Sequence, residues 1–131
     1  MGVKTVRVRV ADLGFADGAL TREIIGSEDD RDLFGHSAPF TGGRGAQLGL
    51  ELCSPDLGPH LRLEYTDQPL GESVYVAMKP IATPDGEPRI FVVAHNAGGL
   101  SLDAARARHD DKWAPDDTFV FCLKQDDQST Q

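Results

Sequence analysis

The stretch from Ser73 to His95 constrains the fold of this chain more than any other. Its sequence, SVYVAMKPIATPDGEPRIFVVAH, holds two runs in which β-branched and aromatic residues alternate with period two. That period is typical of β-strands. Between the runs lies Pro84-Asp85-Gly86, in which proline presets φ for a turn and glycine accepts a positive φ. The stretch therefore predicts two strands joined by a turn.

Both arms of this hairpin are apolar at successive positions, so apolar side chains point to both faces of the sheet. A strand of that kind is covered on both sides, as in the centre of a sandwich or barrel. Pro80 and Pro88 lack a backbone N–H and are expected at strand ends. The hairpin is therefore interpreted as the core of the sheet rather than as a ligand platform.

Further strands are expected on either side of the hairpin. Apolar residues alternate in 6–10, 48–53, 61–65 and 119–123, and the second and third runs predict another hairpin. The stretch 19–25 is assigned to a strand rather than a helical turn, whereas 103–109 has a composition that favours one or two turns of helix.

About seven to nine short strands separated by turn signals predict an all-β, mainly antiparallel fold with little helix. A small β-sandwich or barrel is expected, and a β-trefoil-like barrel is the alternative. The length of 131 residues fits one domain, assigned to residues 1–124, followed by a polar tail, 125–131, that is expected to fray.

The formal net charge of −8 argues against non-specific binding to nucleic acid or to an anionic membrane, although Lys4, Arg7 and Arg9 form a local basic cluster. No apolar run is long enough to span a bilayer, and the first residues lack the apolar core of a signal peptide. A cytoplasmic location is expected. Cys53 and Cys122 both fall in predicted strands and are then most simply buried thiols.

An acidic cluster around the single tryptophan is the first candidate site; it comprises His109, Asp110, Asp111, Trp113, Asp116 and Asp117. Carboxylate oxygens suit Ca²⁺ or Mg²⁺, and an aromatic ring beside carboxylates suits a sugar or a cation. The alternative is a solvated acidic loop whose tryptophan closes one end of the barrel. No cofactor is predicted, although a divalent cation is compatible with these residues.

The histidines offer a second candidate, because His36 in a long irregular segment and His95 at the end of the central hairpin could converge at strand ends. No local metal-binding spacing, phosphate-binding loop or nucleophile elbow occurs, and the acidic run 30–35 lacks the ligands of a calcium loop. Cys53, at a strand end, is a further candidate as a nucleophile if a histidine lies beside it.

Three hypotheses remain open from the sequence. The first is a non-enzymatic module that binds a small ligand, a carbohydrate or a protein at an aromatic patch around Trp113, Tyr65 and Tyr75, free of clustered titratable groups. The second is assembly through an edge strand such as 6–10. The third is a hydrolase or metal-dependent enzyme that uses His95, His109 and nearby aspartates. It requires at least two of these groups within about 4 Å of a common point, or a bound metal.

Overall fold

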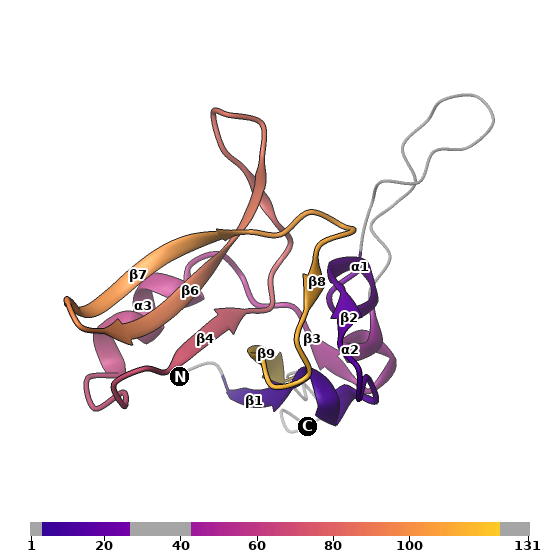
Figure 1. Ribbon diagram of the computed structural model, residues 1–131, viewed down its shortest axis with the longest axis horizontal. Helices are drawn as coiled ribbons and strands as arrows, with labels where there is room; N and C mark the ends of the chain where they lie inside the picture. The colour runs from indigo at the N-terminus through magenta and orange to yellow at the C-terminus, as the bar shows by residue number, and fades with distance from the viewer. Residues whose placement is uncertain (1–3, 27–42, 124–131) are drawn as a thin grey trace, which may run out of the picture.

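A computed structural model describes residues 4–26 and 43–123, and these form a β-rich structure with one mixed sheet of seven strands (Figure 1). The strands of this sheet are β1 (Thr5–Arg9), β3 (Leu50–Glu51), β4 (Ser73–Val76), β5 (Ile81–Ala82), β6 (Pro88–Asn96), β7 (Gly99–Arg106) and β9 (Thr118–Leu123). Two further strands, β2 (Ala19–Leu20) and β8 (Lys112–Trp113), pair as a short antiparallel ribbon.

The helices are short and lie between the strands. They are the 3-10 helix η1 (Val10–Leu13) and the α-helices α1 (Thr21–Ile24), α2 (Arg44–Gln47) and α3 (Leu57–Glu64). Within residues 4–26 and 43–123, no helix has the length and apolar character needed to cross a bilayer.

The predicted central hairpin is present. β4 pairs antiparallel with β6, so that Val74 lies opposite Val93, and the chain between them adds β5 beside the start of β6. Gly86 has a φ of +83° in the connecting turn, as expected of a glycine there. Pro88 is the first residue of β6, where the missing N–H costs no ladder bond.

β9 organises the rest of the sheet. It pairs antiparallel with β1 along one edge, and on its other edge it pairs parallel with β4 and antiparallel with β3. Four of its six residues are buried. The β-rich character expected from the sequence is confirmed. The sheet is mixed, because β4 and β9 run parallel while the other paired strands run antiparallel, and the described strands form no closed barrel.

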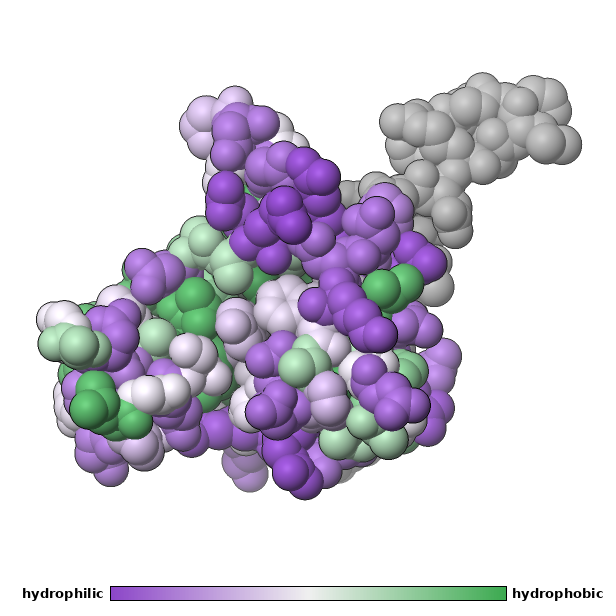
Figure 2. Space-filling view, in the orientation of Figure 1, coloured by the Kyte–Doolittle hydropathy of each residue, from purple (hydrophilic) through white to green (hydrophobic). Residues whose placement is uncertain are grey.

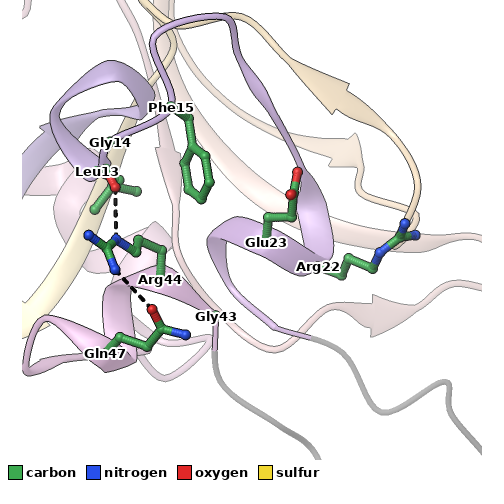
Figure 3. A pocket seen from close by; sticks show the side chains of 8 residues that line it. All are labelled: Leu13, Gly14, Phe15, Arg22, Glu23, Gly43, Arg44 and Gln47. Carbon is green, nitrogen blue, oxygen red and sulfur yellow. Dashed lines mark hydrogen bonds between the residues drawn. The ribbon is translucent and has the colours of Figure 1, made fainter.

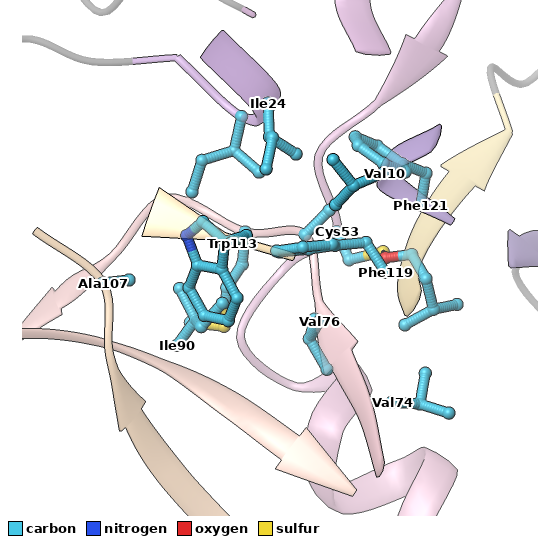
Figure 4. Packing of buried hydrophobic residues seen from close by; sticks show 14 of the residues in the cluster. Val10, Ile24, Cys53, Val74, Val76, Ile90, Ala107, Trp113, Phe119 and Phe121 are labelled. Atoms are coloured by element: carbon cyan, nitrogen blue, oxygen red, sulfur yellow. The ribbon is translucent and has the colours of Figure 1, made fainter. Parts of the chain in front are cut away.

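Both faces of the sheet are covered, as the apolar pattern of the hairpin predicts. On one face, helix α3 lies so close to β6 that a Cβ on Gly58 would meet the Phe91 side chain at 2.8 Å. On the other face, Trp113 of the β2–β8 ribbon packs on Phe119 with ring centroids 5.0 Å apart. Figure 4 shows Trp113 among buried residues that include Ile24 and Ile90.

Three predicted elements differ from the structure. The stretch 19–25, assigned to a strand, keeps only the two residues of β2, and Thr21–Ile24 form helix α1, where the Ile25 N–H donates to the Thr21 carbonyl at 2.9 Å. Residues 57–64 are helical, whereas the sequence pattern predicts a strand at 61–65; Leu61 is partly buried but Leu63 is 78% exposed. The same leucines fit a period of four, which places Leu57 and Leu61 on one side of a helix. Residues 103–106 continue β7 instead of starting a helix, because eight consecutive backbone pairs with β6 outweigh their helical propensity.

Helix α3 is joined to the β6–β7 hairpin by one arginine. Arg62 Nη1 donates to the carbonyl oxygens of Ala94 and Ser101 at 2.8 and 3.1 Å and to Gln68 Oε1 at 2.9 Å. Its Nη2 donates to the Tyr65 carbonyl at 2.6 Å. Gln68 is 2% exposed and in turn donates through Nε2 to strand and loop carbonyls. These bonds satisfy polar groups that would otherwise be buried without partners.

Candidate functional site

An open groove of about 700 Å³ lies between the β6–β7 hairpin and the β2–β8 ribbon. Its lining comes from β4, β6, β7, the following loop and β8, and consists of Tyr75, Arg89, Ala105, Arg106, Asp111, Lys112 and Trp113. In Figure 2, side chains of intermediate hydropathy lie between β7 and β8, with strongly hydrophilic ones above and to the right of them and hydrophobic ones to the left. Segments distant in the sequence therefore combine an aromatic floor with a charged rim.

Three aromatic rings form the floor of the groove and the core beneath it. Tyr75 contacts Trp113 edge-on, with centroids 4.8 Å apart and planes at 71°, and lies 5.7 Å from Phe119. Phe119 is 1% exposed and Trp113 is 7% exposed, whereas Tyr75 is only half-buried. Edge-to-face contacts of this kind stabilise aromatic clusters beyond simple burial. Tyr75 is therefore the ring that the cluster holds in place and still presents to a ligand.

Trp113 is fixed by a hydrogen bond as well as by packing. Its Nε1 donates to Thr21 Oγ1 at 2.8 Å, and Thr21 is 2% exposed. The Thr21 hydroxyl donates onward to the carbonyl of Asp111 at 3.3 Å. A buried indole N–H needs such a partner, so this chain of bonds ties the floor of the groove to helix α1 and to the loop at its rim.

The rim carries three cations, two of which are held by carboxylates. Arg106 donates through Nε and Nη2 to both oxygens of Asp111, each at 3.1 Å, and Arg89 donates to Asp85 at 3.3 Å. Within residues 4–26 and 43–123, Lys112 forms no ion pair. Its ammonium group is exposed at the groove, so it can meet an anionic ligand without breaking an existing pair.

The charges of the rim are set by their neighbours. Burial tends to raise the pKa of Asp111, but the Arg108 backbone N–H and the Arg106 guanidinium outweigh it, and the pKa lies below its usual range. Burial, with a smaller contribution from Asp117, raises the pKa of Tyr75. At neutral pH the groove therefore holds a neutral phenol beside an ionised carboxylate.

A second cavity, of about 400 Å³, is lined by η1, α1 and α2 (Figure 3). Its polar centre is Arg44, whose Nε donates to the Leu13 carbonyl at 3.0 Å and whose Nη1 donates to Gln47 Oε1 at 3.0 Å. Because these bonds are made to the protein itself, Arg44 holds α2 against η1. We therefore place the candidate site in the groove.

The structure brings together only part of the residues that the sequence singled out. Trp113 and Asp111 line the groove, and His109 and Asp110 precede them in the same loop. His95 lies six residues along β6 from Arg89, about 20 Å away at the usual rise of a strand. Its Nδ1 lies 2.7 Å from the Gln68 carbonyl oxygen. His36 and the acidic run 30–35 lie outside the described residues.

His95 thus lies at the end of β6 away from Arg89 and the groove, and the enzyme hypothesis stays a prediction. In the acidic cluster, Asp111 is bonded to Arg106 and Asp117 Oδ2 accepts a hydrogen bond from the Ala114 N–H at 2.8 Å. In the described part of the chain, no three His, Cys, Asp or Glu side chains are grouped as metal ligands would be. These carboxylates shape the turns around Trp113.

The sequence predicted some of the residues that line the groove but not others. Tyr75 was expected near Trp113, and both line the groove. Tyr65 lies elsewhere, where the Arg7 Cζ is 4.3 Å from the centroid of its ring. Arg89 and Arg106 were not singled out, although they face each other in the β6–β7 register. Comparison of the chain with protein-family models, curated proteins and solved structures found no match, so the function is argued from this geometry.

Proposed function

We propose that this chain is a non-enzymatic binding module whose groove takes an acidic carbohydrate. The observation that carries the proposal is the half-buried Tyr75 ring beside Lys112 and Arg106. The apolar C–H face of a sugar packs on an aromatic ring, and a carboxylate or sulfate on that sugar accepts charge-assisted hydrogen bonds from the rim. The groove is open, which suits an extended ligand with its polar edge in water.

The chain as a whole is acidic, with a formal net charge of −8. Long-range attraction therefore does not gather anions at its surface, and recognition rests on close contacts in the groove. An acidic sugar is expected to bind weakly and with a strong dependence on ionic strength, since the rim is exposed. We also propose that the fold is sandwich-like, with the β2–β8 ribbon as a second layer on the main sheet.

The test uses Trp113, the only tryptophan in the sequence, as a reporter inside the groove. Its fluorescence is followed while uronic-acid, sulfated and neutral oligosaccharides are added separately. An acidic sugar is expected to give a saturable change that Lys112→Gln weakens about tenfold, while Lys4→Gln, an equal change of charge outside the groove, leaves it unaltered. Equal responses to acidic and neutral sugars, or none to either, would contradict the proposal.

Assembly through an edge strand is the second candidate. β1 and β7 lie at the two edges of the main sheet, and β7 presents eight residues that pair only with β6. An edge of that length is able to accept a strand from another chain. Light scattering over a range of concentrations tests this idea, and a monomer at the highest concentration would count against pairing between identical chains.

The enzyme hypothesis and a bound divalent cation are addressed by a thermal-shift experiment. A ligand that binds only the folded protein raises the midpoint of unfolding. A rise with Ca²⁺, Mg²⁺ or Zn²⁺ that EDTA reverses would favour a metal-dependent function over the sugar-binding one. We expect no such rise at Asp111, because its carboxylate already neutralises Arg106.

A further inference from the structure

The two cysteines of the chain meet inside the sheet. Their Sγ atoms lie 2.7 Å apart although the residues are 69 positions apart in the sequence, and the residues are 4% and 7% exposed. Both are free thiols in the structure. The separation of the sulfurs exceeds the length of a disulfide bond by only about 0.7 Å.

The backbone explains why the two side chains meet. Cys122 lies in β9, and β3 pairs with the end of that strand, so that Glu51 faces Cys122. Two residues later, the Cys53 N–H donates to the Ala77 carbonyl at 2.7 Å, and Cys53 forms a parallel bridge with Met78. Cys53 is therefore held in place by backbone bonds on both sides of its contact with Cys122.

A shared metal ion does not fit this pair. Zn²⁺ binds thiolates at about 2.3 Å with tetrahedral angles, which separates two sulfurs by roughly 3.7 Å. The sulfurs here are 1.0 Å closer than that, since 3.7 minus 2.7 is 1.0. No third ligand of the His, Cys, Asp or Glu type joins them among residues 4–26 and 43–123.

We propose that Cys53 and Cys122 are the site of an intramolecular disulfide that links the segment before α3 to the central strand β9. With a small-molecule disulfide as oxidant, one protein thiolate attacks a sulfur of that molecule and releases its first thiol. The second protein thiol then displaces the other half. The two protein thiols lose two protons and two electrons in all, and the oxidant is reduced to two thiols.

The folded protein restricts when this reaction occurs. The thiolate is the nucleophile, and burial raises the pKa of the Cys53 thiol, so little thiolate forms in the closed structure. The oxidant reaches the pair when β3 separates from β9 or while the chain folds. β3 is only two residues long, and so short a ladder is expected to open more readily than the rest of the sheet.

The experiment refolds the reduced full-length chain from urea with oxidised glutathione in one sample and with a phosphine reductant in the other. We expect the first sample to lose 2 Da, the mass of two hydrogens, and to yield a peptide that joins Cys53 to Cys122. A link across 69 positions constrains the unfolded chain, so its melting temperature is expected to rise by about 5–15 °C over the reduced sample.

The single variants Cys53→Ala and Cys122→Ala serve as matched controls, and their melting temperatures are expected to be the same with oxidant and with reductant. Two alkylatable thiols after refolding with oxidant, a stable glutathione adduct on either cysteine, or disulfide-linked dimers alone would each overturn the proposal. The mass of the wild-type protein decides the question even where a variant fails to fold.

Discussion

Arg62 and Arg106 lie toward opposite ends of the β6–β7 hairpin and use the same side chain in different ways. Arg62 donates four hydrogen bonds to neutral oxygens, three of them backbone carbonyls on different segments. Arg106 makes a bidentate pair with one carboxylate at the surface. The first arrangement joins α3 to the sheet and uses both Nη atoms of Arg62 in bonds to the protein itself, while its Nε is buried. The ion pair between Arg106 and Asp111 can be exchanged, because an anionic ligand offers Arg106 the same kind of acceptor oxygens as the Asp111 carboxylate.

The largest effect is expected when each of the two arginines is replaced by leucine in a separate variant. Arg62→Leu leaves the carbonyls of Ala94 and Ser101 without their donor and is expected to reduce the free energy of unfolding by about 3 kcal/mol. Arg106→Leu is expected to cost about 0.5 kcal/mol, as is usual for an exposed pair. Urea denaturation measures both. Equal losses in the two variants would remove the distinction between a structural and an exchangeable arginine.

A second prediction concerns the hydrogen bond that fixes the groove floor. Trp113→Phe removes the indole donor and leaves the buried Thr21 hydroxyl without it, at an expected cost of about 2 kcal/mol in unfolding free energy. Thr21→Val removes the acceptor. Together with the double variant these form a thermodynamic cycle, and we expect a coupling of about 1 kcal/mol. A coupling near zero would mean that packing alone positions Trp113.

A smaller effect is expected on the pKa of the Asp111 carboxyl at the groove rim. Arg106→Gln removes the guanidinium that faces Asp111, and the pKa of that carboxyl is expected to rise, because burial then acts on it with less opposition. Carboxyl chemical shifts in an NMR titration of both proteins measure this change. Arg9→Gln is the control, since Arg9 pairs with Asp12 elsewhere. An unchanged Asp111 titration would show that Arg106 does not control the rim.

The smallest effect is expected at the tip of the β5–β6 turn. A hydrogen bond from the Thr83 hydroxyl, with help from the Glu87 N–H and Arg89, lowers the pKa of Asp85 to about 2. A carboxyl with a lowered folded-state pKa stabilises the protein above its ordinary pKa of 3.8 and loses that contribution as the pH falls toward 2. Asp85→Asn is therefore expected to flatten the decline in stability between about pH 4 and pH 2, as urea denaturation at each pH measures.

The sequence predicted the fold where local pattern and pairing agree. The 73–95 hairpin, strand β1 and strand β9 combine period-two alternation with turn residues that match, and all three are present. Helix α3 was missed because its leucines satisfy both a period of two and a period of four. Only packing decides between them, and here Gly58 allows the helix to approach Phe91.

The candidate site was only partly predictable for a different reason. Trp113 and Asp111 lie close together in the sequence, and a reader of the sequence finds them as one cluster. Arg89 and Arg106 become neighbours through the β6–β7 register, and Tyr75 through the parallel pairing of β4 with β9. Those relations depend on which strands pair, and no spacing along the chain encodes them. The short distance between the two cysteine sulfurs likewise results from strand pairing.

The position of β9 in the sheet also bears on how the chain is made. β9 lies between β1, β3 and β4, so each of these earlier strands lacks a neighbour until residues 118–123 have left the ribosome. Before then, the β6–β7 hairpin, with β4 and β5 paired to β6, is the part of the sheet able to form. β9 is thus synthesised after the strands it pairs with, and the unpaired backbone edges of those strands must avoid pairing with other chains during the interval.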